Sequence, residues 1–152
     1  MNKLSFLAKK YNLYLIEDAA EAIGSTLGGK NAGSFSHISC FSLYSNKIIT
    51  TGNGGALCTN DKNIYQLAKK ISFFDFNEKT HFKHNLIGYN LVLSGLQAAL
   101  GLSQINNFKR MLKKRKLVFF WYKEFLKNNQ NIKFIEPIEN CHPNYWFPAI
   151  NI

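Results

Sequence analysis

Three polar side chains near the ends of apolar runs could carry chemistry. Asp18 follows the apolar run LYLIE, Ser42 lies near the end of a second run, HISCFSLY, and Lys47 comes five residues later. Open α/β sheets bind ligands at the carboxyl ends of their strands. Lysine forms Schiff bases with carbonyl cofactors, and a hydroxyl binds phosphate oxygens.

Each of these residues also has an ordinary structural interpretation. Asp18 could be the N-cap of a helix that begins at Ala19, and position alone favours that interpretation. Ser42 could be an alternating strand residue, and Lys47 could be one of many solvent-exposed lysines. Taken singly, none of the three identifies a site.

Other candidate motifs are weaker. The GNGG run at 52–55 could be a phosphate loop, but it lacks Walker spacing. His81 and His84, spaced i, i+3, are a weak metal signal, so we interpret them as surface or substrate-contact histidines rather than metal ligands. The cysteines form no CxxC pair, which argues against a zinc site or a disulfide framework and favours a reducing cytoplasm. They are Cys40, Cys58 and Cys141.

The elements that would position these residues alternate between strands and helices. LYLIE, at 13–17, predicts a buried parallel strand, and 37–44 and 55–59 predict two more strands. Residues 19–23 could form a helix, whereas the glycines at 24, 28, 29 and 33 predict turns. Residues 61–74 predict a helix with Asn60 or Asp61 as N-cap.

A long helix is predicted from Ser94, which forms a capping-box pattern with Gln97. Apolar residues with a 3.6-residue period define one face of it, whereas Phe120 and Trp121 project from the other side. The apolar positions are Phe108, Met111, Leu112, Val118, Phe119, Tyr122, Phe125 and Leu126. Residues 132–135 and 145–150 predict further strands, so the whole pattern indicates an α/β layer.

Composition and charge restrict the class of protein. The chain has 152 residues and a formal charge of +10, and residues 101–127 contain eight basic residues but only one acidic residue. We interpret this basic segment as a solvated helix face rather than a nucleic-acid site. The N-terminus does not resemble a signal peptide, and no apolar run is long enough to span a membrane.

Taken together, the motifs resemble one family over nearly the whole chain. The runs IEDAAEAIGS, KNAGSFSHISCFSLYSNKIITTGNGGALCTND and HNLIGYNLVLSGLQAALGLSQINNF are similar to the DegT/StrS-type nucleotide-sugar aminotransferases. These are pyridoxal-phosphate (PLP) enzymes of fold type I. The resemblance implies a partial large domain, with a mostly parallel sheet and flanking helices, that leads through a long helix into a small C-terminal domain.

The resemblance also implies a role for each candidate residue. Asp18 would pair with the pyridine nitrogen of PLP, and Ser42 would hold its phosphate. Lys47 would be the Schiff-base lysine and would move the proton between carbon atoms. Glu21 would lie near the ring oxygen of the cofactor. Asn90, in the GYN element, would reach toward the cofactor of a partner subunit.

The implied reaction transfers an amino group, usually from glutamate, to a keto group on a nucleotide-linked sugar for polysaccharide or cell-surface sugar biosynthesis. Relatives of this family that act without amino transfer have histidine in place of the lysine, so Lys47 favours amino transfer. The complete enzyme is expected to be a cytoplasmic homodimer with no membrane segment and no specific nucleic-acid partner.

The sequence departs from the family pattern in three places and in length. Glu21 stands where many relatives have Gln, Asn53 where they have Glu, and Val92 where they have Arg. We expect a truncated enzyme with residues 1–93 in the PLP domain, 94–128 in a connecting helix and 129–152 in the small domain. Alone it would be inactive, bind PLP poorly and associate. A non-catalytic remnant or partner of a full-length relative, and a small basic nucleic-acid-binding protein, are the alternatives.

Overall fold

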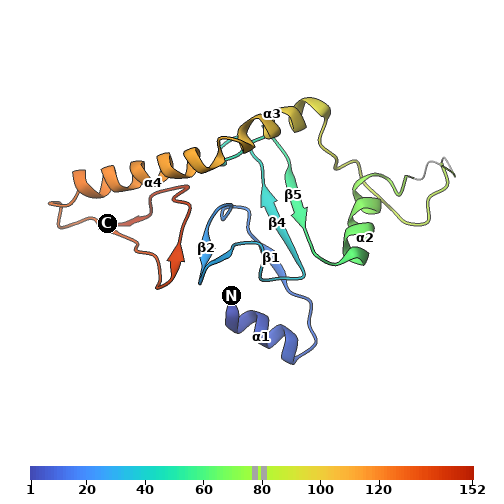
Figure 1. The fold of residues 1–152 in the computed structure, drawn as a ribbon, viewed down its shortest axis with the longest axis horizontal. Coiled ribbons are helices and arrows are strands. Elements are labelled where there is room, and N and C mark those ends of the chain that lie inside the picture. Colours follow the sequence, from blue (N-terminus) through green and yellow to red (C-terminus); the bar gives the residue numbers. More distant parts are fainter. Residues whose placement is uncertain (77–78, 80–81) are drawn as a thin grey trace.

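The computed structural model describes residues 1–76, 79 and 82–152 (Figure 1). Its described elements come in blocks, one helix, five short strands, three helices and three short strands, rather than in the strand–helix alternation that the sequence predicted. The helices are α1 (Asn2–Lys10), α2 (Lys62–Ser72), α3 (Gly95–Ile105) and α4 (Phe108–Phe125). The strands are β1 (Ile16–Asp18), β2 (Thr26–Leu27), β3 (Lys30–Asn31), β4 (Ile38–Ser42), β5 (Gly55–Cys58), β6 (Lys133–Phe134), β7 (Cys141–His142) and β8 (Ile150–Asn151).

The central sheet has the strand order β1–β4–β5. β1 runs parallel to β4, with Asp18 opposite Cys40, whereas β5 runs antiparallel to β4, with Gly55 opposite Ser42. The sheet in this chain is therefore mixed rather than mostly parallel. The reason lies in the connection, because the short loop at 43–54 has no crossover helix and returns the chain antiparallel to β4.

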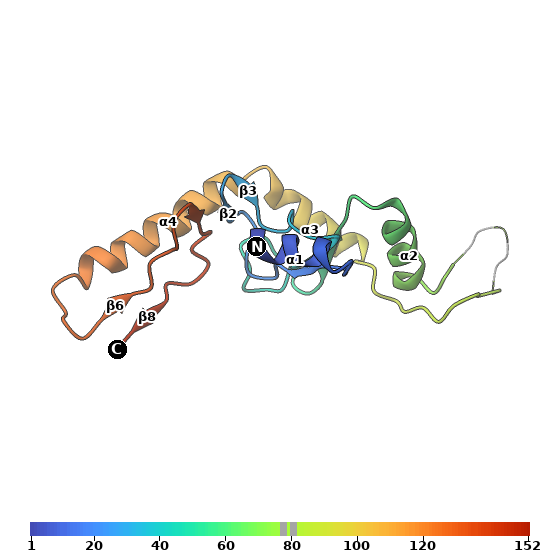
Figure 2. The ribbon, with the colours of Figure 1, turned by 90° about the horizontal axis from the view of Figure 1, so that it is seen from below.

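Two smaller sheets lie outside the central one. In the first, β2 pairs with β3 and also with β7, so that the C-terminal part of the chain adds a strand to an N-terminal hairpin. In the second, β6 pairs with β8. Figure 2 shows the segment that contains β6 and β8 running beside α4. The pairing of β2 with β7 fixes the position of the residues that follow β7.

The predicted long helix is two helices. The capping box at Ser94 is present as expected, with Ser94 Oγ accepting from Gln97 N and Gln97 Oε1 accepting from Ser94 N. α3 then ends at Ile105, and α4 begins at Phe108 after Asn106 and Asn107. No glycine or proline marks this interruption, which is why the apolar periodicity alone did not reveal it.

The remaining secondary-structure predictions had mixed outcomes. α2 begins where expected, with the carboxylate of Asp61 accepting from the backbone N–H groups of Asn63 and Ile64. The helix expected at 19–23 is absent, and that segment forms turns instead. The strand predicted at 145–150 is confined to β8 at its end.

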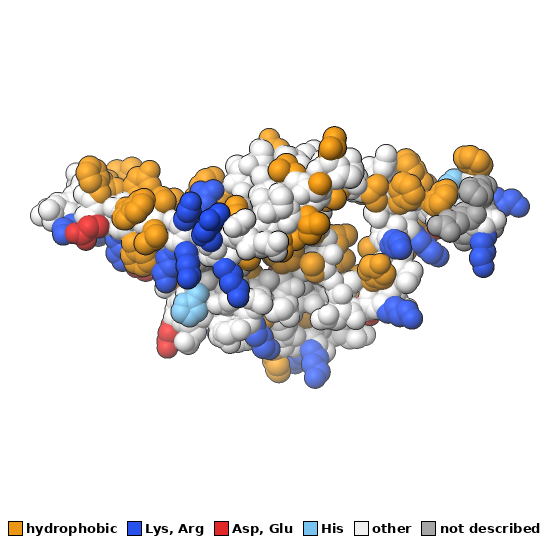
Figure 3. Space-filling view, turned by 45° about the horizontal axis from the view of Figure 1, so that its top comes forward, with side chains coloured by type: hydrophobic (Ala, Val, Ile, Leu, Met, Phe, Trp, Pro, Cys, Tyr) orange, Lys and Arg blue, Asp and Glu red, His pale blue; other side chains and the backbone are white. Residues whose placement is uncertain are grey.

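Little of the apolar surface is buried. Of the described residues, the buried apolar ones are Ala8, Ala19, Ile48, Ile49 and Phe119. The accessible surface is 11825 Å², whereas a compact monomer of 17.4 kDa has about 7,900 Å². The prediction that 13–17 is buried was wrong, since Tyr14 is 80% and Ile16 67% exposed. Figure 3 shows apolar side chains gathered on the surfaces of α4, α3 and α2.

Candidate functional site

Asp18 and Ser42 share one edge and one face of the central sheet. Both residues end their strands, and these strands are parallel neighbours. Asp18 lies opposite Cys40 across the ladder, and Ser42 is two residues beyond Cys40 on the same strand. Because residues i and i+2 of a strand point to one face, the carboxylate and the hydroxyl project from the same side. The register therefore brings these two predicted site residues together.

Both side chains have a hydrogen-bonding atom that is available to a ligand. Asp18 Oδ1 accepts a hydrogen bond from Ala20 N at 3.0 Å, and within the described part of the chain Oδ2 accepts none. The Ser42 hydroxyl accepts from Tyr44 N at 3.3 Å, which leaves its own hydrogen to be donated. The structural interpretation of Asp18 is thus half correct, because it caps a turn but begins no helix.

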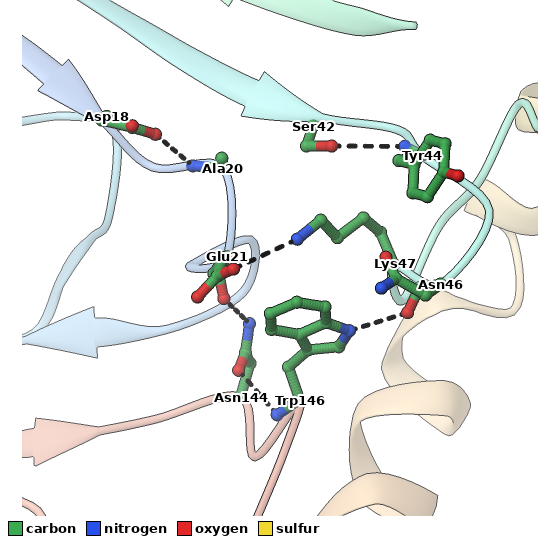
Figure 4. A network of polar contacts seen from close by, with 9 residues as sticks. All are labelled: Asp18, Ala20, Glu21, Ser42, Tyr44, Asn46, Lys47, Asn144 and Trp146. Carbon is green, nitrogen blue, oxygen red and sulfur yellow. Dashed lines mark hydrogen bonds and ion pairs between the residues drawn. The ribbon is translucent and has the colours of Figure 1, made fainter. Parts of the chain in front are cut away.

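Lys47 approaches the same edge from the loop that follows β4 (Figure 4). Its Nζ donates to Glu21 Oε1 at 3.4 Å, and its side chain is only 11% exposed. Ile48 and Ile49, directly after it, are buried and anchor this part of the loop. A long cationic side chain is usually solvated, so the burial of Lys47 separates it from an ordinary surface lysine.

α3 anchors the later part of that loop, residues 50–53. The Gln104 amide makes two bonds to the backbone of Thr50, accepting from its N at 3.1 Å and donating to its O at 2.7 Å. Gln97 Nε2 donates to Asn53 O at 3.3 Å. The side chain of Asn53 accepts from Gly54 N at 2.9 Å within the turn. α3 therefore fixes the loop that carries Lys47.

Sequence reasoning missed two residues that complete the site, Asn144 and Trp146. The Trp146 ring lies under the amine of Lys47, with Nζ 3.5 Å from the ring centroid, and Trp146 Nε1 donates to Asn46 O at 2.7 Å. Asn144 is buried, and its Nδ2 donates to the carbonyls of Glu21 and Ile23 at 2.7 and 3.0 Å. No sequence motif marks these residues, which lie about a hundred positions from Lys47.

The other predicted residues lie apart from this cluster. Asn90 is exposed and forms an isolated bridge with Phe73, at the end of α2. His84 is exposed and lines a shallow cavity with Phe74 and Gly88, and His81 lies outside the described residues. Among the residues described, no three His, Cys, Asp or Glu side chains are grouped as a metal would need.

The cluster combines a carboxylate, a hydroxyl and an amine, the groups that would hold a phosphorylated carbonyl cofactor such as PLP. The open Asp18 oxygen suits a protonated ring nitrogen, the Ser42 hydrogen suits a phosphate oxygen, and the Lys47 amine suits an aldehyde carbon. The residues present therefore fit that group.

This arrangement belongs to a known class. The fold is that of part of the large domain of fold type I PLP-dependent aminotransferases. The aminotransferase PseC of Helicobacter pylori, involved in pseudoaminic acid biosynthesis, matches with a TM-score of 0.90 and 30% identity. The match covers 98% of this chain and 41% of that one. A DegT DnrJ EryC1 StrS aminotransferase from Brucella abortus matches with a TM-score of 0.87 and 28% identity, over 98% of this chain and 39% of its own.

The chain belongs to the DegT/DnrJ/EryC1/StrS aminotransferase family, whose model matches residues 1–151. It is 34% identical over 150 residues to a GDP-perosamine synthase of Escherichia coli, a match that covers 99% of this chain and 41% of that protein. It is 39% identical over 132 residues to a UDP-4-amino-4,6-dideoxy-N-acetyl-beta-L-altrosamine transaminase of Campylobacter jejuni, over 85% and 35% of the two chains.

The chain thus spans about two fifths of the length of these relatives. The family is PLP-dependent, which agrees with the cofactor expected from the sequence. In the described part of the chain, no helix is long and apolar enough to cross a membrane.

Proposed function

We propose that this chain provides the sheet edge and the lysine that bind PLP in an aminotransferase that acts on a nucleotide-linked keto sugar. The observation that carries the proposal is the Lys47 amine, held by Glu21 beside the ends of β1 and β4, where Asp18 and Ser42 share one face. The relatives that are named for GDP- or UDP-linked amino sugars support this substrate class.

In this proposal each residue performs one task. The carboxylate of Asp18 keeps a proton on the ring nitrogen, and the hydroxyl of Ser42 donates to the phosphate. Bound PLP supplies the electron sink for deprotonation of the amino donor. Lys47 would hold the cofactor through Nζ, and the same amine would take the proton from the α-carbon of the donor and deliver it to a second carbon.

The finer parts of the proposal concern partners and organisation. Glutamate is the expected donor, and the complete enzyme is expected to act as a homodimer in which Asn90 reaches the cofactor of the other subunit. The three cysteines are free thiols, which suits a reducing cytoplasm. The boundaries at 93 and 128 between the cofactor domain, the connecting helices and the small domain are likewise proposed.

Borohydride trapping tests the assignment of Lys47. In a full-length or reconstituted enzyme that contains this chain, the protein is incubated with PLP, reduced with borohydride and digested, and the peptides are mapped by mass spectrometry. We expect a reduced pyridoxyl adduct on Lys47, and we expect Lys47→Ala to abolish it. Lys133, an exposed lysine outside the site, serves as the internal control. An adduct spread over surface lysines, unchanged in Lys47→Ala, would refute the assignment.

A further inference from the structure

The amine of Lys47 lies between two groups that each favour a positive charge. On one side is the Glu21 carboxylate, with 3.4 Å between Nζ and Oε1. On the other is the face of Trp146, with 3.5 Å between Nζ and the ring centroid. In the described part of the chain, the two other lysine–aromatic contacts are longer, at 5.3 Å for Lys10 and 5.9 Å for Lys116.

The position of Trp146 is fixed by contacts on three sides. Its Nε1 donates to Asn46 O, the residue before Lys47, and its backbone N donates to Asn144 Oδ1 at 2.9 Å. Phe147 stacks on it, with 4.0 Å between ring centroids. Figure 4 shows the indole between the Lys47 loop and the Asn144 segment. Because these contacts fix the plane of the ring, the lysine meets a preformed surface.

Asn144 in turn ties this segment to the turns between β1 and β2. Its side chain donates to the carbonyls of Glu21 and Ile23, and its backbone N donates to Ser25 Oγ at 3.0 Å. The same amide therefore positions the backbone of Glu21 and the ring of Trp146. The two groups that contact the Lys47 amine are parts of one connected structure.

We propose that Trp146 and Glu21 form a holding site for the ammonium form of Lys47, and that Trp146 is a positioning residue for this lysine. This inference rests on the proposed function. There, the Lys47 amine would be free whenever the nitrogen of the amino donor takes its place on the cofactor, one C–N bond forming as the other breaks. Lys47 Nζ then takes the proton from the donor's α-carbon and is an ammonium until it gives that proton to the second carbon.

The holding site would act during that interval. A cation over an indole face is stabilised by the ring quadrupole, and the effect grows when water is partly excluded, as it is around this side chain. A neutral or covalently bound nitrogen gains little from the ring or from the carboxylate. Trp146 and Glu21 therefore favour the released, proton-carrying lysine and keep its amine at the sheet edge.

Competitive acetylation of the cofactor-free chain tests the holding site without any measurement of activity. Trace acetic anhydride reacts with neutral, accessible amines, and mass spectrometry gives the rate at Lys47 relative to exposed Lys133. We expect Trp146→Leu to raise this ratio about 2- to 30-fold, the range that corresponds to a cation–π contact of about 0.5 to 2 kcal/mol. We expect Trp121→Leu, which changes an exposed tryptophan on α4, to leave the ratio unchanged.

Trp146→Phe separates the contact from a general loosening of the segment. Phe and Leu both lose the N–H bond to Asn46 O, but only Phe keeps an aromatic face. We expect Trp146→Phe to stay nearer the parent ratio than Trp146→Leu. Equal ratios in the two variants, or no rise in either, would overturn the proposal.

Fluorescence gives a second, direct reading. In a Trp121→Phe background Trp146 is the single tryptophan, and we expect Lys47→Met to change its emission while Lys116→Met does not. Unchanged emission in Lys47→Met would contradict the contact. Borohydride trapping on Lys47 together with a negative acetylation result would reject the holding site and leave the proposed function intact.

Discussion

Replacement of Gly101 by alanine should loosen the loop that carries Lys47, although alanine is the better helix former. Gly101 is buried on α3, where a Cβ would lie 2.8 Å from Thr51 Cγ2. Thr51 has little freedom to move, because it is 3% exposed and its hydroxyl donates to Asn53 O at 2.7 Å. The added methyl must therefore push α3 and the loop apart.

The magnitude follows from two opposing effects. A glycine-to-alanine change inside a helix stabilises it by up to about 1 kcal/mol. Overpacking a well-filled contact costs about 1–3 kcal/mol. Because the clash involves a branched side chain held by a hydrogen bond, we take the upper half of that range, about 2–3 kcal/mol, and expect Gly101→Ala to lower the free energy of unfolding by about 1–2 kcal/mol.

Thr51→Ser is the matched partner variant, because it removes Cγ2 and keeps the hydroxyl. In this background the clash is gone, so Gly101→Ala should stabilise by its helix propensity, about 1 kcal/mol. The double-mutant cycle should therefore show a coupling energy of about 2–3 kcal/mol. Urea unfolding followed by circular dichroism at one protein concentration measures all four proteins, and exchange of the Thr51 amide reports the loop itself.

Equal effects of Gly101→Ala in both backgrounds would refute this reasoning, since they would show that the Thr51 methyl does not limit the approach of α3.

Two further predictions concern the sheet and the exposed surface. Glu17→Gln should lower the free energy of unfolding by about 1–3 kcal/mol, measured by urea unfolding. The buried carboxylate accepts from Gly33 N, Phe35 N and Ser36 Oγ, whereas the amide nitrogen of Gln accepts no hydrogen bond. An unchanged urea midpoint would contradict this prediction. The chain should also associate in sedimentation velocity runs, because apolar side chains such as Ile16 are exposed over a large area, and a single monomeric boundary at micromolar concentration would count against that.

The sequence predicted those features that depend on local chemistry. The caps at Asp61 and Ser94 follow from side chains that reach the backbone two or three residues away, so their pattern is visible in the sequence. The failed helix at 19–23 is local too, because Asp18 accepts from Ala20 N in a turn and Gly24 has a positive φ of 82°. The apolar residues at 19–23 predicted a helix and did not reveal that a turn would form in its place.

The features that the sequence did not predict depend on distant contacts. The ring of Trp146 lies against the Lys47 amine and shields it from solvent. Asn144, in turn, positions the Trp146 segment through hydrogen bonds to residues more than a hundred positions earlier. A tryptophan at such a separation has no periodicity that links it to a lysine. The antiparallel direction of β5 likewise follows from the loop, not from the composition of the strand.

The pairing of β2 with β7 also sets the order in which the molecule can be built during synthesis. Residues near the start of the chain must wait for 140–146 before the Lys47 amine gains its ring and Glu21 gains its amide donor. Chains emerge from the ribosome N-terminus first at about 5–20 residues per second, so the sheet edge exists for seconds before the site closes over it. A chain released early, lacking this segment, would still display Asp18, Ser42 and Lys47 but would leave the lysine amine open to solvent.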